Sequence, residues 1–235
     1  LDMDTPQAHG TYVHLYVNGI YWGLYNPSER PQASFCENYI GGIKEEWDVN
    51  NGNTAIDGTY APFDAMLVQV RGGPANNDAF QKIQGNNPDG TRNPAFPAYL
   101  DMPNYIDYML CNFYLGTGDW AGNESQGTRN YYCGRWRNDD SSGYKWFMWD
   151  AERSLQNGIP TGARFGPAEP YDWLKSNSEF RLLFADHAQR HLLNGGALTS
   201  VVRLPQYTAL ADQVRAAMIC EEARWDLSLI HISEP

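Results

Sequence analysis

Apolar and polar residues alternate near the start of the chain in a way that predicts a β-hairpin. Over residues 11–17 valine and leucine recur at every second position and share one face. Asn18 and Gly19 follow, and this pair favours the positive φ angles that a tight type I′ turn requires. The return strand covers 20–25, and Pro27 stops further pairing because proline has no N–H to donate to a ladder.

Helical spacing dominates the second half of the chain. After Asp101, a residue able to cap a helix, apolar residues recur at intervals of three and four until Gly116. A second helix is predicted from the capping-box sequence at 176–179 to Gly195. A third is predicted from about Pro205.

The remaining segments are less regular. Residues 26–101 are rich in Gly, Asn and Pro, which predicts an irregular stretch with short helices near 61–70 and 78–84. Residues 130–136 and 144–149 predict a second hairpin. The order of strands, helix, strands and helices predicts an α+β fold.

Composition narrows the partners. The chain has 17 Lys and Arg against 28 Asp and Glu, a formal charge of −11, so a nucleic-acid partner is not expected. No apolar run reaches the roughly 18 residues of a membrane span. The four cysteines form no CxxC pair, which argues against a zinc site built from them, and their spacing leaves open whether they form disulfides or stay as buried thiols.

Asp119 and Asp150 are the residues that suggest chemistry. Asp119 stands just past a predicted buried helix, and Asp150 ends a hydrophobic strand, with Glu152 two positions later. Such carboxylates need partners, and Mg²⁺ is one that carboxylates and phosphate oxygens hold. Phosphoryl transfer uses one Asp as the base and an Asn with a second Asp as metal ligands. Asn123 and Asn130 lie between the two aspartates.

A purely structural interpretation is also open for each of these residues. An Asp in a Gly-rich turn forms an Asx-turn, and an Asp after a strand caps the next element. His187 and His191 have an i, i+4 spacing that can bind metal, but no Glu follows the first His as in a zinc protease. We interpret them as solvated or core-edge histidines.

Four blocks resemble the CotH-type family, an atypical protein-kinase-like family named after a spore coat protein. They are the hairpin block 17–30, the loop block 112–120, the Arg-Asn-Tyr-Tyr block 129–132 and the aspartate strand 146–152. They occur in the family's order and, with the later helices, cover most of 11–225. The resemblance implies a partial kinase-like α+β domain, with β-hairpins packed on a mainly helical lobe.

The resemblance also implies roles for residues. Asp119 resembles the catalytic-loop base, Asp150 and Asn130 resemble the metal-binding residues, Glu29 resembles the hinge residue beside the nucleotide, and Glu152 is a weaker metal candidate. ATP and Mg²⁺ or Mn²⁺ are the cofactors that these roles imply.

Two departures from the family pattern bear on this assignment. The insertion 121–129 separates Asn130 from the aspartate loop and leaves Asn123 as a rival metal ligand. The family's glycine-containing phosphate loop and nucleotide lysine precede the hairpin, whereas Lys44 follows it and is not adopted. We therefore expect the chain as given to bind ATP poorly or not at all.

We interpret the sequence as a fragment of a secreted bacterial protein recovered from environmental DNA. Residues 1–226 form a partial CotH-like domain, with a hairpin and hinge region at 11–30 and a catalytic-loop and helical region at 101–226. Residues 227–235 resemble a translated sequencing adapter and are treated as a non-native tail.

Two functions fit these observations. The first is a kinase domain that transfers phosphate from ATP to Ser or Thr of an extracellular or surface protein. The alternative is a catalytically inactive binding or structural module at the cell surface, with possible contact to glycans or the cell envelope. The eight tryptophans could stack on sugars in that case.

Overall fold

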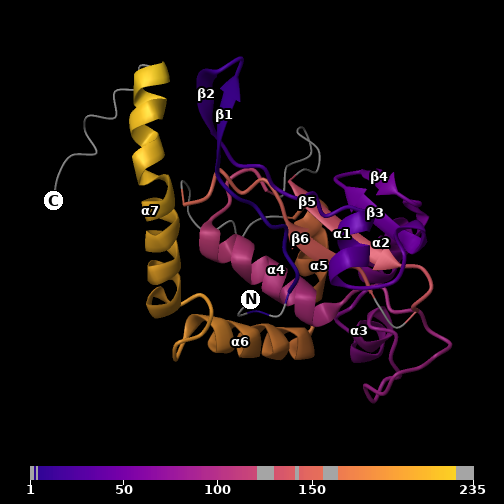
Figure 1. Ribbon diagram of the computed structural model, residues 1–235. Helices are drawn as coiled ribbons and strands as arrows, with labels where there is room; N and C mark the ends of the chain where they lie inside the picture. The colour runs from indigo at the N-terminus through magenta and orange to yellow at the C-terminus, as the bar shows by residue number, and fades with distance from the viewer. Residues whose placement is uncertain (1–2, 4, 121–129, 141–142, 156–163, 226–235) are drawn as a thin grey trace.

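The computed structural model describes residues 3, 5–120, 130–140, 143–155 and 164–225. In this part of the chain the fold is mixed α+β with two antiparallel sheets, as the order of elements predicts (Figure 1). The elements are β1 (Val13–Val17), β2 (Ile20–Tyr25), α1 (Ala33–Tyr39), the short 3-10 helix η1 (Lys44–Glu46), β3 (Trp47–Asn51), β4 (Thr54–Asp57), α2 (Ala61–Arg71), α3 (Asn77–Ile83), α4 (Met102–Leu115), β5 (Tyr131–Trp136), β6 (Lys145–Met148), the 3-10 helix η2 (Gly166–Ala168), α5 (Glu169–Leu174), α6 (Ser178–Leu192) and α7 (Ser200–Trp225).

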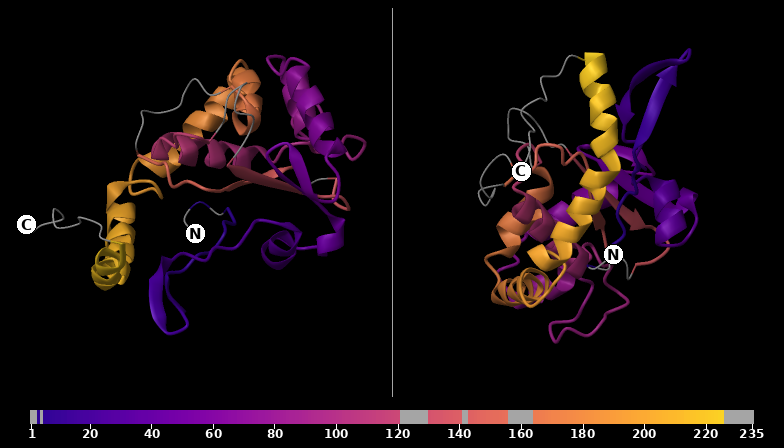
Figure 2. Two further views of the ribbon diagram at one scale, coloured as in Figure 1. Left: turned by 90° about the horizontal axis from the view of Figure 1, so that it is seen from above. Right: turned by 60° about the vertical axis from the view of Figure 1, so that its left-hand side comes forward.

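A four-stranded sheet in the order β4-β3-β5-β6 separates two hydrophobic cores. Tyr131 and Trp146 belong to the larger core, with residues of α2 to α6, whereas Tyr132 and Phe147 belong to the smaller core, with α1. Adjacent residues of a strand point to opposite faces, so each strand contributes to both cores. Figure 2 shows α4 and α5 on one side of the sheet and α1 on the other.

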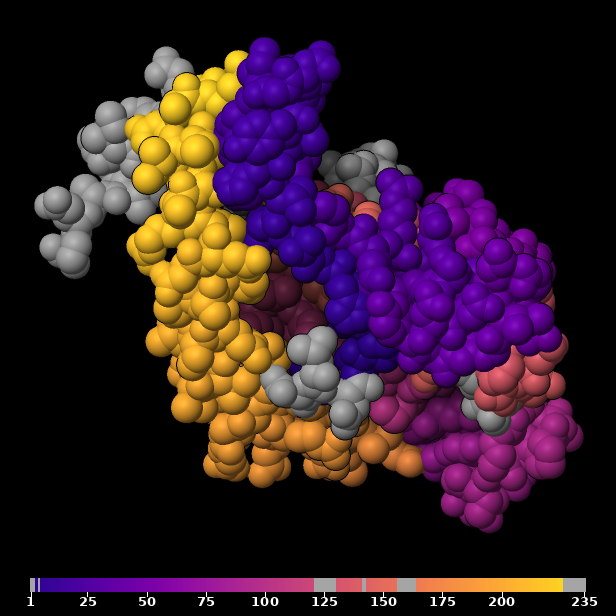
Figure 3. Space-filling view, viewed as in Figure 1, coloured from indigo at the N-terminus to yellow at the C-terminus, as the bar shows by residue number. Residues whose placement is uncertain are grey.

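The β1–β2 hairpin lies apart from this sheet, beside the C-terminal half of α7 (Figure 1). Its turn is the predicted one, because Asn18 and Gly19 have φ angles of 51° and 80°. Glu221 of α7 accepts hydrogen bonds from the hydroxyl of Tyr21, at 2.8 Å, and from the backbone N–H of Leu24. These bonds join the first hairpin to the last helix, and Figure 3 shows the two in contact.

The structure corrects the prediction that residues 26–101 are mostly irregular. That stretch contains α1, β3 and β4 in addition to the two helices predicted there. The predicted second hairpin, β5–β6, forms, but it is half of a larger sheet in which β3 pairs with β5. The strands β3 and β4 form a tight hairpin across Gly52 and Asn53, a local signal that the prediction overlooked. Only the pairing of β3 with β5, about 80 residues later, is out of reach of a local pattern.

Two helix starts also differ from the prediction. The cap of α6 is Asn177, whose side chain accepts from the N–H of Phe180 at 3.0 Å, and not Ser176. The last helix begins at Ser200, so Pro205 lies inside it. A proline near a helix start removes only one backbone hydrogen bond, and α7 is largely exposed, so water can satisfy the carbonyl that is left.

Two further findings concern the chemical setting of the fold. All four cysteines are free thiols. Among the described residues, no helix combines the length and the apolar character that crossing a bilayer demands.

Candidate functional site

Asp119 lies in the loop that follows α4, where a glycine ends the helix. Gly116 has the left-handed conformation (φ 58°, ψ 46°), and its N–H donates to the carbonyl groups of Asn112 and Phe113. Glycine adopts this conformation without the steric cost that a Cβ imposes. The helix therefore ends sharply and the chain turns directly into the Asp119 loop.

Trp120 holds this loop against α4. Its side chain is 1% exposed, and its ring N–H donates to the hydroxyl of Tyr108 at 2.5 Å. The indole also meets the rings of Tyr108 and Phe113 edge-on. Burial raises the pKa of Tyr108 far above its usual value, so this hydroxyl stays protonated. Asp119 is consequently placed between a helix end and an anchored side chain.

One carboxylate oxygen of Asp119 is buried without a partner. Its Oδ1 atom has no hydrogen bond from any described residue. Leaving a buried polar atom unsatisfied costs about 1–3 kcal/mol, and more when the group is charged. A cation or the hydroxyl of a bound molecule would remove this cost.

Asn130 and Asp150 lie at the same end of the β5–β6 hairpin. Asn130 directly precedes β5 and Asp150 follows β6, in a register that pairs Tyr131 with Met148. Both have positive φ, 59° and 54°, a conformation that Asn and Asp adopt more readily than other residues with a Cβ. The side-chain amide of Asn130 donates to the backbone carbonyl of Asp119 at 3.4 Å. The structure therefore brings Asn130 into contact with the Asp119 loop.

The turn after β6 runs beside the same loop. The N–H of Gly118 donates to the carbonyl of Arg153 at 3.0 Å, and the N–H of Leu155 donates to the carbonyl of Leu115 at 2.7 Å. Asp150 and Glu152 are both exposed, so the expectation that Asp150 is a buried carboxylate in need of a partner is wrong. Three segments that carry predicted site residues, namely the loop after α4, the start of β5 and the turn after β6, therefore meet.

Comparison with known protein families identifies the chain. A family model described as CotH kinase protein matches residues 1–193. The chain belongs to the CotH kinase family. A search of curated proteins gave no match. The resemblance drawn from the four sequence blocks is thus confirmed, and membership of the CotH family indicates a kinase-like function.

Glu29, the predicted hinge residue of the CotH domain, makes local contacts. Its Oε2 atom lies 2.7 Å from Nδ1 of His9 and accepts from the backbone N–H of His9 at 3.1 Å, while its Oε1 accepts from the hydroxyl of Tyr39 at 2.8 Å. The bonds from His9, followed by the bond from Tyr39, lower the pKa of Glu29. Glu29 therefore ties the segment before the hairpin to α1, and its place beside a nucleotide stays a prediction. Asn123 falls outside the described residues.

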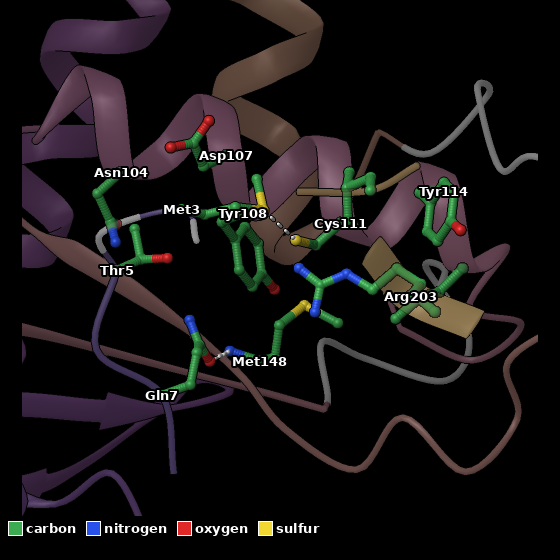
Figure 4. A pocket seen from close by; sticks show the side chains of 12 residues that line it. Met3, Thr5, Gln7, Asn104, Asp107, Tyr108, Cys111, Tyr114, Met148 and Arg203 are labelled. Carbon is green, nitrogen blue, oxygen red and sulfur yellow. Dashed lines mark hydrogen bonds between the residues drawn. The ribbon is translucent and has the colours of Figure 1, made fainter. Parts of the chain in front are cut away.

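A mainly apolar cavity of about 250 Å³ opens beside α4 (Figure 4). On its floor the side chain of Gln7 accepts a hydrogen bond from the N–H of Met148 at 3.0 Å. Met148 stands two positions before Asp150, so the cavity reaches the strand that leads to the predicted metal ligand. The residues that line it are Met3, Thr5, Gln7, Asn104, Asp107, Tyr108, Cys111, Tyr114, Leu115, Met148, Leu198 and Arg203.

The structure corrects the interpretation of His187 and His191 as solvated or core-edge histidines. Both are buried, at 9% and 3% exposure, and both contact Asp107 of α4. Their i, i+4 spacing was a visible signal. The carboxylate that completes the group comes from a helix 80 residues earlier, which no local pattern could indicate.

Proposed function

We propose that this CotH domain transfers the γ-phosphate of ATP to serine or threonine hydroxyls of an extracellular or cell-surface protein, with Mg²⁺ or Mn²⁺ bound. The observation that carries the proposal is the buried, unpartnered Oδ1 of Asp119, in a loop that Asn130 and the turn after Asp150 both contact. Membership of the CotH kinase family supports it.

Each residue of the site has a role in this proposal. Asp119 orients the acceptor hydroxyl and takes its proton. Asn130 and Asp150 provide oxygen atoms, the donors that Mg²⁺ and Mn²⁺ prefer, and Glu152 and Asn123 are further candidates for the same ion. When bound, the ion neutralises charge on the phosphates during transfer.

The positioning of the acceptor depends on rigid neighbours rather than on the carboxylate alone. Trp120 and Gly118 fix the backbone on either side of Asp119 through bonds to α4 and to the turn after β6. A base held in place by such neighbours loses little entropy when the substrate binds. The proposal therefore predicts that the site is formed before ligands arrive.

Phosphate transfer to an acceptor protein is the direct test. Labelled ATP with Mn²⁺ is supplied to this chain and, where the parent gene extends the reading frame upstream, to the longer protein. Asp119→Asn keeps the shape of the side chain and removes the base, so we expect the transfer rate to fall by about 100-fold or more. Asp186→Asn removes an exposed carboxylate of α6 and serves as the matched control, with wild-type rate expected.

Metal binding is measured separately, as the rise in melting temperature that Mn²⁺ causes. Asp150→Asn should abolish this rise, whereas Asp119→Asn should leave part of it. Equal transfer rates in the wild type and both variants would rule out the assigned roles. If both this chain and the longer protein fold and bind Mn²⁺ but transfer no phosphate, the inactive surface module is favoured.

A further inference from the structure

Asp107 of α4 and His187 and His191 of α6 form a buried group away from the Asp119 loop. Nδ1 of His187 lies 2.6 Å from Oδ1 of Asp107, and Nε2 of His191 lies 3.2 Å from the same oxygen. One possible ligand atom from each residue lies within 4.8 Å of the other two. Asp107 also lines the cavity beside α4, and in Figure 4 its carboxylate lies on the side opposite Gln7 and Met148.

The surroundings of His191 also suit a metal ligand. Its side chain is almost fully buried, yet its Nε2 atom has no hydrogen-bond partner of good geometry among the described residues. A neutral imidazole nitrogen offers the lone pair that a metal ion binds. Nε2 lies 3.2 Å from Oδ1 of Asp107 without a well-aligned hydrogen bond, which is unfavourable for a buried ring nitrogen, and a metal ion between the two atoms would bind both.

We propose that Asp107, His187 and His191 bind a divalent transition-metal ion of the borderline class that includes Zn²⁺. Two imidazoles and one carboxylate suit such an ion, whereas Mg²⁺ and Ca²⁺ prefer oxygen donors alone. The site therefore differs in ligand type from the all-oxygen site proposed for phosphate transfer. It does not depend on that proposal.

The distances match such an ion after one small change. Metal–ligand bonds of about 2.0–2.2 Å place neighbouring ligand atoms about 3 Å or slightly more apart. The His191–Asp107 separation of 3.2 Å already fits. The His187–Asp107 separation of 2.6 Å is that of a hydrogen bond, which opens when the ion enters. When Nδ1 binds the ion, the neutral imidazole of His187 carries its one proton on Nε2, so the ring stays neutral.

The bound ion would join α6 to α4, the helix that leads into the Asp119 loop. Asp107 lies in α4, whose C-terminal end leads into the Asp119 loop, and both histidines lie in α6. An ion shared by the two helices stabilises the folded state, because the unfolded chain does not hold the three ligands together. Three protein ligands also leave a coordination position for water.

The experiment uses the full chain without a histidine tag. Zinc is added to protein freed of metal with a chelator, and binding is measured by equilibrium dialysis and by the melting temperature. We expect one Zn²⁺ per chain and a rise in melting temperature that Mg²⁺ at the same concentration does not produce. His187→Gln, His191→Gln and Asp107→Asn should each weaken zinc binding by about 100-fold or more, beyond the loss known for outer-shell changes.

Two control variants are expected to bind zinc as tightly as the wild type. His14→Ala removes an exposed histidine of β1, and Asp150→Asn removes a ligand of the other proposed site, so both should bind zinc as the wild type does. Circular dichroism without metal shows which variants fold. If Asp107→Asn does not fold, the zinc binding of His187→Gln and His191→Gln tests the proposal. Undiminished zinc binding in those variants, or no zinc-dependent melting shift in the wild type, would overturn the proposal.

Discussion

Asn104 of α4 supplies the hydrogen bonds that a neighbouring strand would otherwise give to β6. This strand is at the edge of the four-stranded sheet. The Asn104 side chain accepts from the N–H of Trp146 at 2.6 Å and donates to the carbonyl of Trp146 at 3.4 Å. Gln7 accepts from the next outward N–H, that of Met148. Because Asn104 is 5% exposed, water has little access to replace it.

We expect Asn104→Ala to lower the free energy of unfolding by about 2–3 kcal/mol. The loss comes mainly from the Trp146 N–H, a buried donor left without an acceptor, since the contact to the carbonyl is long. Urea unfolding followed by tryptophan fluorescence measures it, with the slope m unchanged if the change is one of stability alone. Asn138→Ala, at an exposed position, is the control, with a change within about 0.5 kcal/mol.

The predicted order of the losses in unfolding free energy gives a second test. Gln7→Ala should cost less than Asn104→Ala, about 1 kcal/mol, because Gln7 is only half-buried and water can reach the freed N–H. If Asn104→Ala unfolds at the same urea concentration as Asn138→Ala, the view that a side-chain amide completes the sheet edge is refuted.

Two further predictions concern charged groups. Asp48 is fully buried, and its carboxylate accepts a hydrogen bond from Nη1 of Arg137 at 2.7 Å. Arg137→Ala should therefore lower the free energy of unfolding by about 2–4 kcal/mol. Urea unfolding measures this change, and an unchanged midpoint would contradict it. The pKa of Glu29 is lowered from 4.5 by the bonds from His9, so its carboxylate stabilises the fold above that pH, and the contribution disappears as the pH falls through the lowered pKa. The melting temperature of Glu29→Gln should therefore be lower than that of the wild type at neutral pH and equal to it in acid. A difference in melting temperature that persists in acid would contradict this role of the Glu29 carboxylate.

The features that were predicted correctly depend on neighbours in the sequence. The hairpin turn follows from Asn18 and Gly19, which adopt positive φ without help from distant residues. The bounds of α4 follow from a cap and a stop, since Asp101 accepts from the N–H of Asn104 at 3.1 Å and Gly116 is left-handed. Local hydrogen bonds of this kind are formed within a few residues, so the sequence alone displays them.

The features that were missed depend on contacts between distant segments. Strand β3 pairs locally with β4, but its place in the larger sheet depends on β5, and the edge of β6 is completed by a side chain from a helix. His187 and His191 become a possible metal site only where Asp107 lies beside them. In each case the local pattern is compatible with several structures, and packing selects one of them.

The α+β class, the CotH family, the first hairpin turn and the ends of α4 could be inferred from the residues alone, because each depends on residues close together in the chain or on the order of short blocks. Which polar groups are buried, and what faces them, became known only from the folded arrangement. The unpartnered oxygen of Asp119 and the carboxylate between two histidines exist because segments distant in sequence were folded together. Burial removes the water that would hydrogen-bond to such groups, so a buried polar side chain is stabilised when a ligand takes the place of that water.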